Sequence, residues 1–117
     1  MVGFSALLLA AACLGGCAGP DIRVANDTTY MLSQIEITTP SQTESFGTLA
    51  PREMSDYVGF SEAYKYAAAR FVAAGSPWEI NPIDYGDTDE LGAGEYTYHL
   101  ATASTGLDTV YLFTTED

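Results

Sequence analysis

The chain has 117 residues, of which 16 are acidic and four are basic, so its formal net charge is −12 at pH 7. A charge this negative argues against a nucleic-acid partner, because affinity for nucleic acid comes largely from Lys and Arg contacts to phosphate. The length is enough for one compact domain with a single hydrophobic core, and not for two.

The N-terminal segment has the pattern of a secretory signal. Residues 4–14, FSALLLAAACL, carry no charge. This run is too short to cross a bilayer as a helix, which takes about 20 apolar residues, and it matches the apolar part of a signal peptide, typically about 7–15 residues. A buried N-terminal helix is a poor alternative, because the glycines and the proline within residues 15–20 would break it.

The end of this segment resembles the lipobox of bacterial lipoproteins. Residues 14–17 read LGGC, and the lipobox combines a leucine, two small residues and a cysteine in this order. The resemblance implies cleavage before Cys17 and attachment of a lipid to its thiol. Ala18 at the next position implies the outer membrane, with the protein facing the periplasm. Residues 1–3 lack the Lys or Arg that a signal peptide normally carries, which leaves open a start further upstream.

We therefore expect a signal peptide over residues 1–16, a lipidated Cys17 with a short tether over residues 17–21, and a single domain over residues 22–117. The four residues between Cys17 and Ile22 reach about 14 Å when fully extended, which would hold the domain close to the membrane. Cys17 would be the only cysteine left after cleavage, so we expect no disulfide, no zinc–thiolate site and no cofactor.

Strand-like runs follow one another at short intervals. Ile35 and Ile37 alternate with Gln34 and Glu36, as in a strand with one buried face. The last run is apolar on both faces and rich in β-branched and aromatic residues, as in a strand that is covered on both sides. The runs are residues 22–25, 34–38, 45–49, 55–60, 96–100 and 107–114. They predict an all-β fold, a small antiparallel β-sandwich of immunoglobulin-like or similar type.

Residues 61–74, SEAYKYAAARFVAA, carry two conflicting patterns. Apolar side chains recur at helical spacing, and Ser61 and Gly75 would cap such a helix. Alternatively, residues 70–74 and 78–80 are two strands around a Gly-Ser-Pro turn. We predict that residues 64–74 are mostly strand, with a helical turn around residues 61–66 left open.

Three blocks of the chain resemble a family of small, functionally uncharacterised bacterial lipoproteins. Within residues 55–67 the chain reads SDY and FSEAYKYA, residues 81–85 read NPIDY, and residues 91–98 read LGAGEYTY. The resemblance implies a β-sandwich with a hairpin after the Tyr-Lys-Tyr element, and it implies no functional residues. In the relatives an extra residue separates the equivalents of Tyr85 and Gly86, so the acidic loop is shorter here.

The acidic loop offers the strongest candidate for metal chemistry. Asp84, Asp87, Asp89 and Glu90 place four carboxylates within seven residues, and calcium prefers such oxygen ligands. The calcium loop of helix–loop–helix proteins does not fit, because a loop starting at Asp87 has a leucine and a tyrosine at two ligand positions. The alternative is a solvated acidic turn.

The histidine and the tyrosines each allow two interpretations. His99 is the only histidine and lies on a predicted strand opposite the tyrosine face, which favours an exposed or edge position over catalysis. Tyr64, Tyr66, Tyr96 and Tyr98 either fill the core or form an exposed aromatic platform for a glycan. Cross-strand aromatic pairs stabilise sheets, which favours the core.

Together these patterns predict a non-enzymatic, lipid-anchored protein of the bacterial envelope with a structural role or a role in binding a protein or glycan. The alternative is a calcium-dependent protein- or glycan-binding module that uses residues 84–90.

Overall fold

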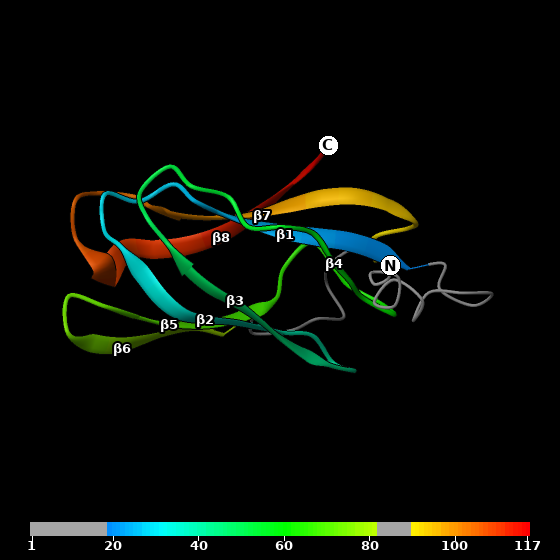
Figure 1. The fold of residues 1–117 in the computed structure, drawn as a ribbon, viewed down its shortest axis with the longest axis horizontal. Helices are drawn as coiled ribbons and strands as arrows, with labels where there is room; N and C mark the ends of the chain where they lie inside the picture. Colours follow the sequence, from blue (N-terminus) through cyan, green and yellow to red (C-terminus); the bar gives the residue numbers. More distant parts are fainter. Residues whose placement is uncertain (1–18, 82–89) are drawn as a thin grey trace, which may run out of the picture.

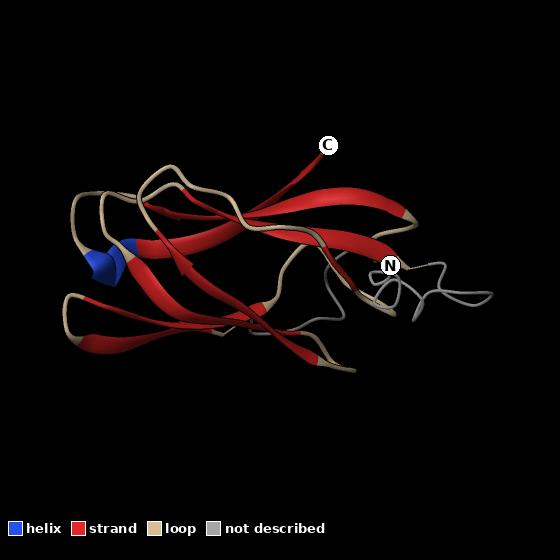
Figure 2. Ribbon diagram, viewed as in Figure 1, coloured by secondary structure: helices blue, strands red, loops and turns tan. Residues whose placement is uncertain are grey.

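A computed structural model describes residues 19–81 and 90–117 (Figure 1). The described chain forms eight strands and one short 3₁₀ helix. They are β1 (Pro20–Asn26), β2 (Leu32–Thr38), β3 (Thr43–Leu49), β4 (Val58–Gly59), β5 (Ala68–Ala73), β6 (Ser76–Ile80), β7 (Gly94–Thr102), η3 (Leu107–Thr109) and β8 (Val110–Glu116). Figure 2 shows the strands in red in two layers, which confirms the all-β sandwich predicted from the sequence.

The two sheets differ in their strand directions. The first sheet has the order β4-β1-β7-β8 and the second has the order β3-β2-β5-β6. All pairs of the second sheet are antiparallel, but β1 and β7 are parallel from the Pro20–Gly94 pair to the Asn26–Leu100 pair. The first sheet is therefore mixed, and the prediction of a purely antiparallel sandwich was wrong at this pair. Parallel neighbours need a long crossover, and here the crossover includes the whole second sheet.

The core lies between the sheets and follows the alternation seen in the sequence. Ile22 and Val24 of β1 and Ile35 and Ile37 of β2 have no exposed surface. The other fully buried large apolar side chains come from all parts of the sandwich: Leu32, Phe60, Phe71, Tyr98 and Leu100. Apolar surface on the inner faces thus holds the two layers together.

A buried polar network closes the end of the sandwich where β1 finishes. Asn26 has no exposed surface, and its Nδ2 donates to the Tyr30 carbonyl at 2.7 Å and to the Leu49 carbonyl at 3.0 Å. Its Oδ1 accepts from the Thr28 N–H at 2.9 Å and from the Thr28 hydroxyl at 2.7 Å. The Asn26 amide therefore provides hydrogen-bond partners for backbone groups of the turn after β1, and it also joins the first sheet to the end of β3.

The segment with conflicting patterns is strand over residues 68–73 and irregular before that. The helical turn left open around residues 61–66 is not formed. Tertiary hydrogen bonds hold these residues in an extended path instead: Leu91 N–H donates to the Ala63 carbonyl at 2.8 Å, and the Tyr98 hydroxyl donates to the Tyr64 carbonyl at 2.6 Å. Contacts with β7 and with Leu91 thus override the local helical pattern.

The hairpin predicted between β5 and β6 is confirmed, but its turn is shorter than the predicted Gly-Ser-Pro turn, because Ser76 and Pro77 already pair with β5 as part of β6. Ala74 and Gly75 have φ values of 52° and 77°, so two residues with positive φ connect the strands, as in a type I′ turn. The Trp78 indole N–H donates to the Ala73 carbonyl at 3.0 Å across the hairpin.

The last strand lies elsewhere than its apolar sequence predicted. β8 is an edge strand of the first sheet, and Leu112 is its only buried residue. Tyr111 points to the outer face and is 44% exposed. The expectation of a strand covered on both sides was wrong, because β8 lies at the edge of its sheet and its outer aromatic rings stack on one another while Tyr111 stays exposed.

Candidate functional site

The residues next to the predicted lipidation site are held tightly by the fold. Cys17 itself lies outside the described residues. A Cβ on Gly19 would meet the Phe60 carbonyl oxygen at 1.9 Å and the Ser61 carbonyl oxygen at 2.9 Å, so only glycine fits. The Phe60 N–H also donates to the Pro20 carbonyl at 2.9 Å. The folded body therefore begins two residues after Cys17, and the domain start expected at residue 22 was too late, because Pro20 and Asp21 already pair within β1.

Of the four acidic candidates, the structure places one. Asp84, Asp87 and Asp89 lie outside the described residues, and Glu90 forms an isolated bridge with Tyr64. Within residues 19–81 and 90–117, no cluster of three or more His, Cys, Asp or Glu side chains is arranged to hold a metal ion. The same residues include no helix of a length and hydrophobicity that would span a bilayer.

His99 lies on the outer face of β7 between a carboxylate and a hydroxyl. Its Nδ1 is 2.8 Å from Asp27 Oδ2, and its Nε2 is 2.8 Å from Thr115 Oγ1. The ring stacks on Phe113 with centroids 4.5 Å apart and planes within 4°. The imidazole side chain is 19% exposed, so most of its surface is covered even though it lies on the outer face of the sheet.

This order of hydroxyl, imidazole and carboxylate resembles that of a catalytic triad, but its surroundings differ. The bonds from Asp117 N–H to the Glu95 carbonyl and from Ala103 N–H to the Thr109 carbonyl fix which β7–β8 pairs exchange hydrogen bonds. Hydrogen-bonded pairs alternate along the two strands, so the Thr115 N–H donates to β7. It therefore cannot donate to a substrate bound at the Thr115 hydroxyl. The network joins three segments of the first sheet. Asp27 and Thr115 are 72 and 16 residues from His99, and no spacing in the sequence indicated them.

A second network fixes the end of β8 to β1. Asp117 accepts hydrogen bonds from the Tyr57 hydroxyl at 2.5 Å and from the Thr97 hydroxyl at 2.8 Å, and Arg23 Nε lies 3.4 Å from its carboxylate. The bond from Tyr57 is the main reason why the pKa of Asp117 is below its ordinary value, and Thr97 and Arg23 act in the same direction. The same bond raises the pKa of Tyr57. Arg23 also lies over the Tyr57 ring, 4.9 Å from its centroid.

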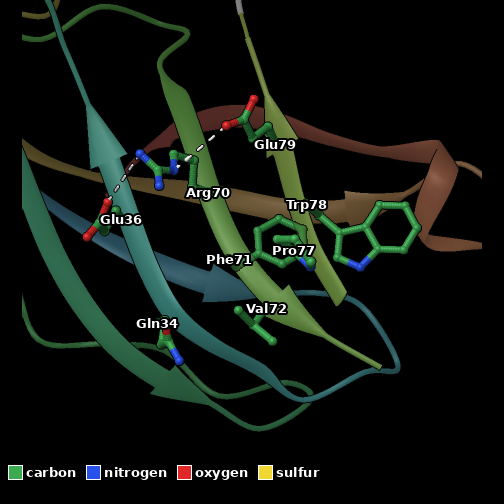
Figure 3. A pocket seen from close by; sticks show the side chains of 8 residues that line it. All are labelled: Gln34, Glu36, Arg70, Phe71, Val72, Pro77, Trp78 and Glu79. Atoms are coloured by element: carbon green, nitrogen blue, oxygen red, sulfur yellow. Dashed lines mark ion pairs between the residues drawn. The ribbon is translucent and has the colours of Figure 1, made fainter. Parts of the chain in front are cut away.

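The outer face of the second sheet has a shallow depression of about 200 Å³ (Figure 3). Arg70 of β5 lies in it between two carboxylates, 4.0 Å from Glu36 of β2 and 3.8 Å from Glu79 of β6. Val72 and Pro77 add apolar surface, and the Trp78 ring lies apart from the ion pairs in Figure 3. Arg70 is 63% exposed, and exposed ion pairs of this kind contribute little stability.

A second depression of about 200 Å³ lies beside β8. Leu91 and Tyr96, both buried, form part of its wall, and Glu90, Glu116 and Lys65 add charged groups. The Thr114 hydroxyl, also in this wall, donates to the Lys65 carbonyl. This depression contains the one described residue of the predicted acidic site.

The tyrosines divide between the two interpretations. Tyr96 and Tyr98 are buried and belong to the core, whereas Tyr66 is 49% exposed. The sequence reasoning missed the outer row formed by Tyr111, Phe113 and His99, because it assigned the last strand to the interior. Within this row the rings stack on one another, with Tyr111 and Phe113 at 5.8 Å, so much of their face area is already in contact.

Comparisons of the chain with protein-family models, with curated proteins and with solved structures found no match.

Proposed function

We propose that this chain is a lipid-anchored protein of the bacterial envelope with a non-enzymatic structural or binding role. In this proposal Cys17 carries the lipid, the protein is held at the outer membrane, and the β-sandwich faces the periplasm. The observation that supports it best is the closeness of the fold to the predicted lipidation site. Gly19 already packs against Phe60 and Ser61, so only Ala18 separates the predicted anchor from the folded body.

The position of the first strand adds support. β1 begins at Pro20 and lies between β4 and β7, inside the first sheet. A signal peptide that stayed attached would continue from a strand that is fixed on both sides, whereas cleavage before Cys17 leaves β1 complete. The predicted cleavage site and the start of the fold are therefore compatible.

The proposal is tested by expressing the full chain in a Gram-negative host and measuring the mass of the mature N-terminus. The expected product begins at Cys17, carries acyl groups and partitions into the detergent phase of a phase-separating extraction. The Cys17→Ser variant is the control and should stay unprocessed and without acyl groups. A wild-type chain that keeps residues 1–16 and has an unmodified thiol would contradict the proposal.

The alternative is a calcium-dependent protein- or glycan-binding module. Glu90 is the described part of its acidic loop, and Glu116 lies with it in the wall of the same depression. Millimolar calcium should raise the Tm if this alternative holds, and Glu90→Gln should reduce the increase. An unchanged Tm would remove calcium from consideration.

A further inference from the structure

The described strands leave four sheet edges, and three of them are protected against pairing with another strand. β4 is only two residues long. β6 contains Pro77, which has no N–H to donate. β3 has a register shift at Gly47, where φ is 74°, and such a bulge interrupts pairing. Short edges, prolines and bulges are the usual devices that prevent edge-to-edge association.

β8 has none of these devices. It is seven residues long, contains no proline and pairs with β7 without a register shift. Since Asp117 and Ala103 form bonds with β7 partners, the N–H and C=O groups of Leu112 and Thr114 point away from β7 by alternation. In the described part of the chain, no backbone group bonds to them. The outer edge of β8 is therefore ready to receive a strand.

The depression beside this edge indicates the chemistry of the incoming strand. Leu91 and Tyr96 provide an apolar wall, and the charged groups are two carboxylates, from Glu90 and Glu116, and one ammonium group, from Lys65, so the lining keeps an excess of negative charge. A Lys or Arg side chain fits such a site, because its aliphatic stem packs on apolar surface while its charge meets the carboxylates. The net charge of −12 attracts a basic segment and repels a second copy of this acidic chain.

We propose that the outer edge of β8 binds an extended basic segment of a partner protein by strand addition. The segment pairs with the backbone of Leu112 and Thr114 and places a Lys or Arg side chain in the Glu90–Glu116 depression. Backbone hydrogen bonds provide affinity, and the depression provides selectivity. This inference rests on the binding role proposed above but not on the lipid, so the two fail separately.

The test uses the full chain in non-ionic detergent micelles and a synthetic nine-residue peptide that alternates lysine and valine. Calorimetric titration measures its affinity, and NMR hydrogen exchange follows the amides of Leu112 and Thr114. We expect both amides to become protected on binding. Thr114→Pro removes an outward N–H at a position where an edge strand tolerates proline, and it should weaken binding at least about tenfold.

Ser45→Pro is the matched control, because the bond from Thr39 N–H to the Gln42 carbonyl places the Ser45 N–H on the outer edge of β3. It should leave the affinity unchanged. Equal weakening by both prolines, or unchanged binding to Thr114→Pro, would overturn the proposal.

A charge variant keeps the test decisive if Thr114→Pro fails to fold. Glu116→Gln should weaken binding about threefold, and Glu44→Gln on β3 should not. Equal losses of affinity in the two variants would show that the peptide is attracted by net charge alone.

Equally tight binding of a threonine–valine peptide would exclude a basic partner. Dimerisation of the chain through β8 without peptide, measured by sedimentation, would make a second copy the occupant. Each of these results contradicts the proposal.

Discussion

Polar side chains of the first sheet and of the second sheet are used in different ways. Those of the first sheet have little exposed surface: Asn26 has none and reaches Leu49, the His99 side chain is 19% exposed and joins Asp27 to Thr115, and the Asp117 side chain is 20% exposed and joins Tyr57 to Thr97. On the second sheet, Arg70 meets Glu36 and Glu79 at 4.0 and 3.8 Å, and all three are well exposed. Burial makes a polar bond costly to lose, whereas exposed groups recover water as partners.

The largest effect is expected from Asn26→Asp. A carboxylate cannot donate to the Tyr30 and Leu49 carbonyls, and it would be a charge without exposed surface. We expect the free energy of unfolding to fall by about 3 kcal/mol or more, measured by urea denaturation. Asn81→Asp is the control, since Asn81 is exposed, and it should change stability by less than about 0.5 kcal/mol. Similar losses in both variants would contradict the importance of burial.

Asp117→Asn should lower stability at neutral pH by about 1–2 kcal/mol, because it weakens charge-assisted bonds to Tyr57, Thr97 and Arg23.

The pH dependence of this effect has a definite sign. The folded-state pKa of Asp117 is below the ordinary 3.8, so its contribution is present above about pH 4 and is lost as the pH falls through the lowered pKa. The difference between wild type and Asp117→Asn should therefore shrink between about pH 4 and pH 2. A constant difference over this range would show that the carboxylate charge is not involved.

The His99 network is expected to have a smaller effect. A double-mutant cycle of His99→Ala and Asp27→Ala should give a coupling energy of about 1 kcal/mol, because the Asp27 side chain is 40% exposed and water weakens the interaction. Thr115→Val should have a lesser effect, since Thr115 is exposed. A coupling energy near zero would show that the His99–Asp27 pair contributes no more to stability than the exposed ion pairs of the second sheet.

The smallest effect is expected from Arg70→Gln, which removes both ion pairs of the second sheet. The stability should change by less than about 0.5 kcal/mol, and the change should vanish at high salt because exposed charges are screened. A loss above about 1 kcal/mol would show that the exposed network is stronger than its geometry indicates.

Local patterns in the sequence predicted those elements that depend on neighbouring residues. Alternation at Ile35 and Ile37 identified β2, and the turn signal that begins at Gly75 identified the β5–β6 hairpin, although Ser76 and Pro77 belong to β6 and not to the turn. Position within a sheet depends on partners far along the chain, and local patterns do not show which partners these are. The rings on the outer side of β8 stack on one another and stay partly exposed, and residues 61–67 do not form a helix because they make contacts with Tyr98 and Leu91.

The candidate sites show the same division. Gly19 lies two residues after the predicted lipidation site, but nothing in the sequence indicated its close approach to Phe60 and Ser61, because this is a tertiary contact. Asp27 is an ordinary turn residue and Thr115 an ordinary strand residue in the sequence. The parallel pairing of β1 with β7 brings Asp27 to His99, and the antiparallel pairing of β7 with β8 brings Thr115.

The parallel pairing of β1 with β7 also bears on the order in which the molecule forms. The hairpins β2–β3 and β5–β6 join neighbours in the sequence, whereas β1 must find a strand whose paired residues are 74 positions away. Closing so long a loop costs conformational entropy before the β1–β7 contacts form and compensate for it, and contacts of this kind slow folding. We therefore expect the second sheet to assemble early and the centre of the first sheet to close last, when the two ends of the body meet.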